Sequence, residues 1–429
     1  MKQIAVIGGG WAGLAAAVAA TQRGHRVSLL EMAPQLGGRA RSVAHEDELL
    51  DNGQHILIGA YTQALELMTN IGVDVDQALL RMPLRLRYPD HEGLSLPAGA
   101  PLTSFVRGVM AHRSWPLGAR LRLLATATGW MLRRFKCASK LSVEQLCSGL
   151  PTQVNEELIK PLCVAALNTP AREASAAVFL RVLHDALFSG RGGSDLLLPR
   201  VGLSALLADP AQAWLRQHGC IVRTGTRATQ LASQSDGWLL DGQYFDAVIL
   251  ACPSGEAARL CEGFAPAWAA QAQAFRFEPI ITVYLQSAGS TLPAPMIALR
   301  ESEQAPAQFA FDLGQTHHTP GRFAFVVSGA SSWIERGLAA TGEAVLAQAQ
   351  RELSWATPPE VLKVLAEKRA TFACTPGLKR PAALIAPGLW AAGDYVAGPY
   401  PATLEGAVRA GQEAALQADR ETTRTTFSM

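Results

Sequence analysis

This chain of 429 residues is poor in charge, and what it lacks narrows the classes of protein to which it can belong. Charged residues make up 17% of it, against about 25% in an average soluble protein. The net charge is +2, from 38 basic and 36 acidic residues, which argues against a nucleic-acid binder with its strongly basic domain. With 49% apolar residues, the chain is too hydrophobic to be disordered. Its length predicts about two or three domains, and its low charge predicts a large core or an apolar surface.

The sequence also lacks the cysteine patterns of disulfide-bonded and zinc-binding proteins. Its seven cysteines are an odd number and none forms a C-x-x-C pair, so we expect reduced thiols and no metal site. No signal peptide is recognisable, because Met1-Lys2-Gln3 runs directly into a short apolar segment. No window holds the roughly 18 uninterrupted apolar residues of a transmembrane helix. These absences predict a cytoplasmic protein.

What the chain does contain is a strand, a glycine turn and a helix at its start. Ile4–Ile7 is an apolar run typical of a strand buried on both faces of a parallel sheet. Gly8–Gly13 has the pattern G-x-G-x-x-G, Leu14–Thr21 has the composition of an alanine-rich helix, and Arg26–Leu30 is a second apolar run that ends at Glu31. This order is typical of a dinucleotide-binding unit.

The residue types in this unit have physical roles. Gly8 permits a tight turn, Gly10 lets a pyrophosphate approach the backbone, and Gly13 lets the helix pack on the strand, with the phosphates at the helix N-terminus. Glu31 is placed to accept hydrogen bonds from a ribose diol and would repel a 2′-phosphate, so FAD or NAD is favoured over NADP. The predicted cofactor contacts of this unit are Gly8, Gly10, Trp11, Ala12, Gly13, Glu31 and Met32.

A second glycine pair lies in Gly37-Gly38-Arg39-Ala40-Arg41, where the planar guanidinium groups suit a diphosphate. This segment resembles the amine oxidase and phytoene desaturase superfamily of flavoproteins, and the resemblance favours FAD. It implies that Gly38 and Arg39 contact the pyrophosphate region of FAD. The alternation of apolar runs and a helix in 195–275 matches the second half of the FAD site in that superfamily, which places the backbone of Ala228 at the adenine.

The far end of the chain carries the matching motif. An apolar run ends in Gly393-Asp394, and a helix begins within Ala402–Gly411; its N-terminus would stabilise negative charge on a reduced flavin. The motif resembles the C-terminal flavin motif of carotenoid desaturases, which implies that Asp394 bonds the ribityl-phosphate side. The resemblance also places four residues at the cofactor, the last two under the isoalloxazine: Gly393, Ala402, Thr403 and Leu404.

The most distinctive segment is Asp51-Asn52-Gly53-Gln54-His55, followed by Gly59-Ala60-Tyr61. An Asp-x-Gly element runs beneath the flavin ring in the superfamily, so the cofactor contacts predicted here are Gly53, Gln54 and His55. The whole string resembles the hydroxysqualene dehydroxylases, a family of bacterial flavoenzymes. The resemblance covers nearly the whole chain but is weaker through 81–194 and 276–369. It implies the replacement of an allylic hydroxyl of hydroxysqualene by hydrogen, which gives squalene for hopanoid synthesis.

This reaction needs an acid near the hydroxyl, an apolar pocket that excludes water, and hydride transfer from N5 of the reduced flavin to an allylic cation. His55 is the predicted catalytic residue, as the acid or the oxygen-orienting group, with a structural histidine as the alternative. Asp51 is the second catalytic candidate, although we expect it to bond backbone in its turn. Tyr61 and Tyr400 are candidates to line the pocket, with core packing favoured for Tyr61, and we expect His317-His318 in a solvated loop.

The predicted fold is α/β, with a Rossmann-like FAD-binding domain that carries an inserted α+β substrate domain, as in amine oxidases and phytoene desaturases. The FAD-binding domain is predicted in 1–80, 195–275 and 370–418. The substrate domain is predicted in a helical part, 81–194, and in a second part, 276–369, and a flexible tail is predicted in 419–429. Helical patches are expected at Leu102–His112 and Leu117–Phe135, and strands at Ile280–Leu285 and Phe323–Val327.

Acidic residues are absent between Glu92 and Glu144, where cationic residues are interleaved with Trp, Leu, Met and Phe. The cationic residues are Arg107, Arg113, Arg120, Arg122, Arg133, Arg134, Lys136 and Lys140. Such a mixture is typical of helices that lie in an anionic membrane interface, so we expect the protein on the inner face of the bacterial membrane. A core helix whose arginines reach water is the alternative.

Three other functions stay open at this point. The first is an FAD-dependent desaturase or isomerase of a carotenoid or other polyisoprenoid, with hydride passing to oxidised flavin. The second is an amine oxidase, for which we find no aromatic cage, and the third is a non-enzymatic isoprenoid carrier. The partners predicted by the leading hypothesis are hydroxysqualene, the anionic membrane surface and upstream enzymes of the squalene pathway.

Overall fold

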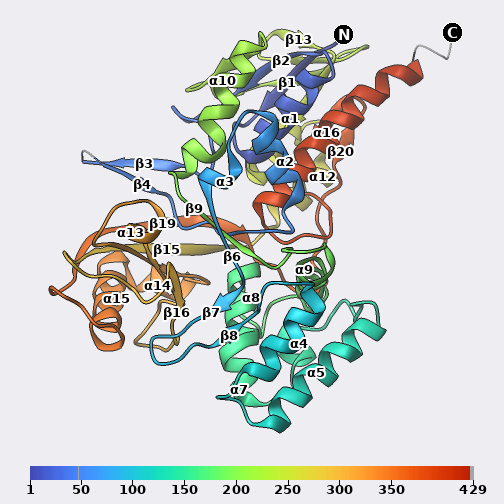
Figure 1. The fold of residues 1–429 in the computed structure, drawn as a ribbon. Helices are drawn as coiled ribbons and strands as arrows, with labels where there is room; N and C mark the ends of the chain where they lie inside the picture. Colours follow the sequence, from blue (N-terminus) through green and yellow to red (C-terminus); the bar gives the residue numbers. More distant parts are fainter. Residues whose placement is uncertain (47, 426–429) are drawn as a thin grey trace.

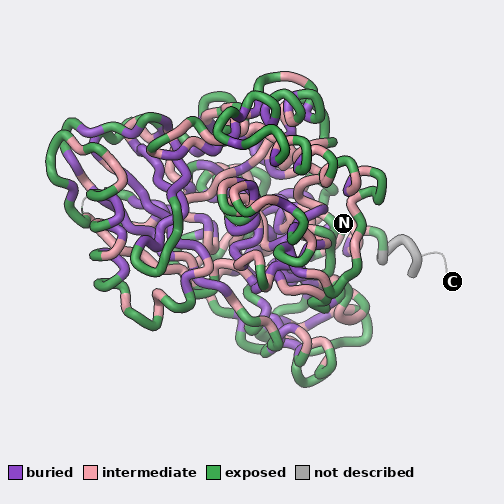
Figure 2. The backbone as a smooth tube through the Cα atoms, turned by 90° about the horizontal axis from the view of Figure 1, so that it is seen from below, coloured by how far each residue is buried: buried purple, intermediate pink, exposed green. Residues whose placement is uncertain are grey.

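The computed structural model describes residues 1–46 and 48–425, and their predicted α/β class is confirmed. In Figure 1 a body containing both the first strands and the last helix lies at the top, an antiparallel sheet lies at the lower left, and a group of helices lies at the lower right. Buried segments run through the interior and exposed segments lie at the rim (Figure 2). The predicted domain boundaries stay a prediction.

A mostly parallel sheet forms the centre of the upper body, with β20 antiparallel to β21. Its strands, in spatial order, are β10 (Ile221–Arg223), β2 (Arg26–Leu30), β1 (Gln3–Ile7), β14 (Ala247–Leu250), β21 (Leu389–Ala391) and β20 (Leu384–Ala386). Within the sheet, Ile4 is in register with Val27 on one side and Ala247 on the other. Because β1 lies inside the sheet and is covered on both faces, its apolar run is continuous rather than alternating.

Alternate residues of β1 contribute to two cores: Ile4 and Val6 to one, Ala5 and Ile7 to the other. The first core is closed by the helices α1 (Trp11–Gln22), α2 (Thr62–Asn70), α10 (Asp209–Gln217) and α16 (Leu404–Thr425). The second core is closed by β11 (Leu231–Ser233), β12 (Trp238–Leu240), β13 (Gln243–Phe245) and α11 (Ser254–Cys261), next to α12 (Pro266–Gln273). Segments from both ends of the chain therefore share one core.

An antiparallel sheet forms the lower left body. In spatial order its strands are β16 (Met296–Ala298), β17 (Phe309–Asp312), β18 (Arg322–Val327), β15 (Phe277–Gln286) and β19 (Glu360–Phe372). Side chains of one face, such as Val283 and Phe325, pack on α15 (Leu338–Glu352), with α14 (Ser331–Arg336) beside it. The opposite face, which includes Tyr284, joins the core of the helical group.

The helical group at the lower right consists of α4 (Pro101–Ala111), α5 (Leu117–Leu132), α6 (Val143–Leu146), α7 (Thr152–Val154), α8 (Lys160–Leu167) and α9 (Ala176–Phe188). Short strands link the bodies: β5 (Leu57–Ile58), β6 (Leu79–Met82) and β9 (Leu196–Pro199) form one small sheet, and the hairpins are β3 (Ser42–His45) with β4 (Glu48–Asp51) and β7 (Arg85–Leu86) with β8 (Leu94–Ser95). Short helices α3 (Val75–Ala78) and α13 (Leu313–Thr316) complete the connections. Within the described ranges, no helix combines the length and hydrophobicity that crossing a bilayer requires.

Several predicted boundaries were wrong. Helix α1 begins at Trp11 rather than Leu14, because the chain turns into the helix directly at Gly10. Helix α5 ends at Leu132 rather than Phe135, because Arg134 and Phe135 both have left-handed backbone angles. The predicted tail, 419–429, begins inside α16, which continues to Thr425, and residues 426–429 lie outside the described part of the chain.

Candidate active site

The glycine turn between β1 and α1 leaves open space next to the helix N-terminus. Gly8 has φ +109°, and a Cβ added there would lie 2.6 Å from the carbonyl oxygen of Ala251. A Cβ on Gly13 would overlap the carbonyl oxygen of Gly8, so β1 and α1 can touch only because both positions are glycine. A Cβ on Gly10 would meet nothing closer than the Cα of Gly38, at 3.8 Å. The turn therefore combines close packing with an open approach to the backbone, as a pyrophosphate requires.

The first turn of α1 offers free hydrogen-bond donors to this space. The backbone N–H groups of Trp11, Ala12 and Gly13 have no acceptor among the described residues, and Gly10 provides no side-chain cap. The indole Nε1 of Trp11 is also buried, and no described residue accepts a hydrogen bond from it. Free N–H groups and the helix dipole favour an anion at this position. The residues present thus fit the diphosphate of a dinucleotide.

Glu31, which directly follows β2, holds the turn from the other side. Its Oε2 accepts a hydrogen bond of 2.6 Å from the N–H of Gly9, and its Oε1 accepts one of 2.7 Å from the N–H of Ala33. The neighbouring Met32 is exposed. The segment leading to the buried Ala228 runs alongside, since the N–H of Thr226 donates to the carbonyl of Glu31 at 2.8 Å. The structure therefore brings the residues predicted for the ribose and the adenine to the same sheet edge.

The second glycine pair lies directly against the first turn. The N–H of Gly37 donates to the carbonyl of Gly9 at 2.8 Å, and next to it Arg39 extends toward the C-terminal motif. The Nη2 of Arg39 lies 2.7 Å from Oδ2 of Asp394, and its Nη1 donates to the carbonyl of Ala370 at 2.7 Å. The two motifs predicted a cofactor role for both Arg39 and Asp394, but not that these side chains form an ion pair with each other.

Arg380 is a residue that the sequence analysis missed. Its Nη1 donates to the backbone carbonyls of Asp394 at 3.1 Å and Tyr400 at 2.7 Å, so it fixes both ends of the loop between β21 and α16. Its guanidinium also lies 5.3 Å from the ring centre of Phe372. Burial lowers the pKa of Arg380 from its ordinary value. No motif surrounds this arginine, so only the folded chain shows its role.

Asp51 is held in place by hydrogen bonds to other parts of the chain. Its Oδ1 accepts hydrogen bonds from Ser42 Oγ at 2.7 Å and from the N–H of Leu203 at 2.8 Å, and its backbone carbonyl accepts one from the Tyr284 hydroxyl at 2.7 Å. Its Oδ2 lies 3.6 Å from Nε2 of His317. These contacts favour a role in holding the segment rather than in catalysis. They also correct the expectation for His317, whose side chain is 16% exposed and packs against Asp51, whereas His318 is exposed as expected.

His55 is half-buried on the same segment. Burial lowers its pKa to about 4, although the charge of nearby Asp51 acts in the opposite direction. Its Nε2 is enclosed and has no hydrogen-bond partner among the residues that the structure describes. This lowered pKa favours the neutral imidazole at neutral pH, and a neutral ring can orient an oxygen by a hydrogen bond. The neighbouring Gln54 donates from Nε2 to the Tyr284 hydroxyl at 3.2 Å.

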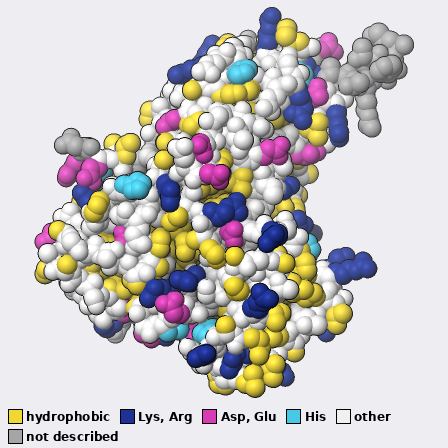
Figure 3. Space-filling model, viewed as in Figure 1, with side chains coloured by type: hydrophobic (Ala, Val, Ile, Leu, Met, Phe, Trp, Pro, Cys, Tyr) yellow, Lys and Arg dark blue, Asp and Glu magenta, His cyan; other side chains and the backbone are white. Residues whose placement is uncertain are grey.

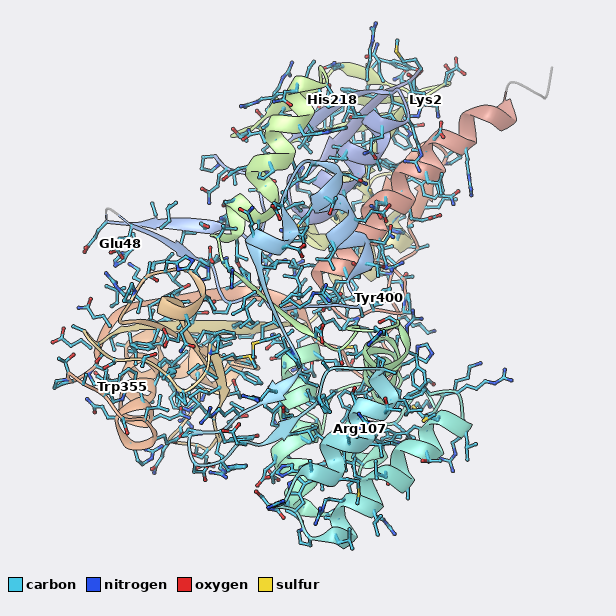
Figure 4. The ribbon with its side chains drawn as sticks, viewed as in Figure 1. Lys2, Glu48, Arg107, His218, Trp355 and Tyr400 are labelled. Carbon is cyan, nitrogen blue, oxygen red and sulfur yellow. The ribbon has the colours of Figure 1, made fainter. Side chains whose placement is uncertain are left out.

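A small cavity of about 30 Å³ lies where the upper body meets the helical group, next to Tyr400 (Figure 4). Its lining residues come from the segment after β5, from α8 and α9, and from the start of the C-terminal motif: Ile58, Ala60, Tyr61, Ala166, Val182, Asp185, Tyr400, Pro401 and Thr403. Burial raises the pKa of Tyr61, and a hydrogen bond with Thr403 partly offsets that effect. Both tyrosines thus line this cavity, rather than Tyr61 serving the core alone.

Charged groups on α9 and α16 surround the same cavity. Arg181 donates from Nε to both carboxylate oxygens of Asp185, at 3.0 and 2.8 Å, and from Nη2 to the Tyr400 hydroxyl at 3.1 Å. On α16, Arg409 donates to the buried Glu405 at 2.7 Å. Helix α16 begins at Leu404, within the predicted range, and Ala402 and Thr403 directly precede it. Both pairs have i, i+4 spacing, which is the signal that the sequence contains for this group.

Comparisons with known proteins agree with this geometry. A family model described as "Flavin containing amine oxidoreductase" matches residues 11–418. The hydroxysqualene dehydroxylase of Rhodopseudomonas palustris is 30% identical, over 96% of this chain and 97% of its own length. That of Zymomonas mobilis is 28% identical, over 96% and 97%. Among solved structures, an oxidoreductase of Methanosarcina mazei has a TM-score of 0.73 at 15% identity, covering 97% of this chain and 100% of its own. That likeness concerns the fold alone.

Proposed function

We propose that this chain, which belongs to the family of flavin-containing amine oxidoreductases and uses FAD, reductively removes the hydroxyl group of hydroxysqualene to give squalene. The observation that carries the proposal is the likeness over nearly the whole length to proteins named hydroxysqualene dehydroxylase. The enclosed, unpaired nitrogen of His55 supports a hydrogen bond to an oxygen of the substrate.

We assign FAD to the region where the two glycine elements and the C-terminal motif meet. The free N–H groups of α1 would hold the diphosphate, Glu31 the ribose, and the pair of Arg39 and Asp394 the region between diphosphate and ribityl chain. The full set of residues proposed to contact the cofactor is Gly8, Gly10, Trp11, Ala12, Gly13, Glu31, Met32, Gly38, Arg39, Gly53, Gln54, His55, Ala228, Gly393, Asp394, Ala402, Thr403 and Leu404.

The overall change replaces a carbon–oxygen bond by a carbon–hydrogen bond. The hydroxyl takes up a proton that comes ultimately from solvent and leaves as water, and the allylic cation left behind accepts a hydride. Reduced FAD supplies that hydride when it is bound. We assign His55 to hold the hydroxyl oxygen by a hydrogen bond from its neutral ring, and Asp51 to keep the segment 51–55 in place through Ser42 and Leu203. The reaction also requires a pocket that excludes water, which would otherwise capture the cation.

Anaerobic single turnover tests this function. The purified flavoprotein is photoreduced and mixed with hydroxysqualene, and we expect one squalene per flavin together with the return of the oxidised flavin spectrum. Absence of both would contradict the proposal. Flavin reduction on mixing the oxidised protein with a carotenoid-like polyene would instead show a desaturase, and isoprenoid binding by a preparation without flavin would show a carrier.

We also propose that α4, α5 and the turn after them rest on an anionic membrane surface, where the enzyme receives its substrate from upstream squalene-pathway enzymes. Apolar and cationic side chains gather over these helices at the lower right of Figure 3. Leu117 and Leu132 are exposed at the two ends of α5, and Arg133 and Arg134 follow directly. Exposed leucines beside arginines suit the boundary between headgroups and acyl chains.

Charge reversal tests this location. The wild-type protein is expected to co-sediment with vesicles that contain phosphatidylglycerol at low salt. The double variant Arg133→Glu/Arg134→Glu is expected to lose most of that binding, because each cation near an anionic surface contributes about 1 kcal/mol. Equal sedimentation of the two proteins, or no binding by the wild type even at low salt, would remove this part of the proposal.

A further inference from the structure

A second cavity, of about 300 Å³, lies apart from the residues discussed so far. It opens where β6, the segment leading into α4, and the loop before β9 meet. Its polar lining residues are Arg81, Ser104, Arg191, Ser194 and Asp195, and the rest of its wall consists of Leu84, Leu96, Pro97, Ala98, Gly99 and Gly192. A cavity of this size can hold a small polar group of several heavy atoms together with water.

The charges in this cavity do not cancel. The Nη1 of Arg81 lies 3.3 Å from Oδ2 of Asp195, so these two groups form one pair. Arg191 is exposed and has no ion pair or hydrogen bond within residues 1–46 and 48–425. One guanidinium therefore remains available at the cavity, and an anion is the ligand that it favours.

A buried hydroxyl independently points to a ligand. Ser104 is 4% exposed, and its Oγ makes no hydrogen bond to any described residue, although buried polar side chains are normally paired. The neighbouring Gly99 has φ +151°, and a Cβ added there would lie 3.1 Å from this Oγ. The glycine thus keeps the approach to the hydroxyl open, and the hydroxyl lines the cavity without a partner.

The start of α4 adds further donors beside the hydroxyl. This helix begins at Pro101, and its N-cap, Ala100, supplies no side-chain hydrogen bond. In the described chain the backbone N–H groups of Leu102 and Thr103 also have no acceptor. A free helix N-terminus, an unpaired serine hydroxyl and an unpaired guanidinium together are typical of a phosphate site.

We propose that this cavity binds the phosphate group of an anionic lipid. The apolar side chains Leu102, Val106 and Met110 recur along α4 at four-residue spacing, on the face turned away from Ser104, and are 37%, 41% and 38% exposed. A phosphate held at the start of α4 would therefore belong to a lipid of the same bilayer that the exposed face of this helix contacts. The inference rests on the membrane location proposed above and gives it a defined contact, but it does not depend on the dehydroxylation reaction.

The test uses the flavin-loaded protein and two probes. Calorimetric titration with sn-glycerol 1-phosphate measures the site without a bilayer, and sedimentation with vesicles of phosphatidylglycerol, against vesicles of phosphatidylcholine, measures it on a surface. The variants are Arg191→Ala and Ser104→Ala. The matched control is Arg107→Ala, which removes an equal charge from an exposed position on α4 outside the cavity.

We expect Arg191→Ala to weaken binding of both glycerol phosphate and phosphatidylglycerol vesicles at least about tenfold, and Ser104→Ala by a smaller factor in the same direction. Arg107→Ala is expected to change glycerol phosphate binding less than about twofold. Equal losses for Arg191→Ala and Arg107→Ala on vesicles, with no binding of glycerol phosphate, would overturn the proposal in favour of diffuse attraction. Glycerol phosphate binding that depends on Arg191, combined with unchanged vesicle binding, would overturn the lipid assignment. Squalene formation in detergent, measured in parallel, separates either failure from a failure of the proposed reaction.

Discussion

Helices α1 and α5 are both rich in apolar residues, yet the protein treats them in opposite ways. Trp11–Ala20 of α1 is entirely buried, because the sheet covers one side and α10 and α16 cover the others. Helix α5 buries Ala119, Leu123 and Trp130 but exposes Leu117, Leu121 and Leu132. Apolar composition therefore does not determine burial; the number of neighbouring elements does. An apolar helix face without neighbours in its own chain is the kind of surface that binds another apolar phase.

Substitution of one glycine in each helix gives the largest expected difference between buried α1 and exposed α5. Gly13→Ala places a Cβ on the carbonyl oxygen of Gly8 and forces α1 away from β1, so we expect loss of bound flavin and a free energy of unfolding lower by about 3 kcal/mol. Gly129→Ala in α5 meets nothing within 4 Å and is expected to stabilise the protein by up to about 1 kcal/mol. Flavin absorbance and urea denaturation measure both variants. Full flavin content in Gly13→Ala would show that the contact between β1 and α1 is looser than described.

Two leucines of α5, two positions apart, sharpen the comparison within one helix. Leu123 is 1% exposed and Leu121 is 51% exposed. We expect Leu123→Ala to lower the free energy of unfolding by about 2 kcal/mol, the lower end for leucine truncation because the helix lies at the outside of the molecule. Leu121→Ala is expected to leave stability within about 0.5 kcal/mol but to reduce sedimentation with phosphatidylglycerol vesicles. A stable Leu123→Ala variant, or unchanged vesicle binding in Leu121→Ala, would count against the two-sided character of α5.

The variant His55→Ala tests whether the enclosed, unpaired side chain of His55 has a function in turnover. We expect turnover to fall about 100-fold while flavin stays bound, since the variant removes the group that orients the hydroxyl. Steady-state rates and the flavin spectrum measure the two effects separately. Full turnover in the variant would remove His55 from the mechanism.

The pH dependence of stability tests the burial of the same residue. An unfolded histidine takes up a proton near pH 6.5, whereas the pKa of His55 in the folded protein is about 4. The unfolded chain therefore binds more protons between these values, and the folded state loses stability as the pH falls from 6.5 to 4, by at most about 1.4 kcal/mol per pH unit. Urea midpoints across this range should depend less on pH in His55→Ala than in the wild type. Identical slopes would show that His55 is protonated more readily than its burial implies.

The sequence predicted the parts of the fold that depend on neighbours along the chain. The spacing of Gly8, Gly10 and Gly13 determines a strand, turn and helix locally, and β2 was predicted to the residue. The environment of Asp51 was not predictable in the same detail, because its partner Leu203 lies far away in the sequence. The same is true of Arg380, whose acceptors are backbone carbonyls that no residue type reveals. Exposure of the α5 leucines depends on which elements pack against that helix, and periodicity alone does not contain this information.

The close contact between α1 and α16 has a consequence for how the protein is made. A Cβ on Gly411 would overlap the carbonyl oxygen of Ala12, and the Nζ of Lys2 donates to the carbonyl of Ala418 at 2.7 Å. Helix α1 is therefore synthesised long before α16, the helix against which it packs. At about 5 to 20 residues per second, nearly 400 residues of intervening chain take roughly 20 to 80 s to synthesise. During that time the nascent glycine turn is without the Asp394 segment, so we expect flavin to be captured only after that segment has been synthesised and truncated chains to depend on chaperones.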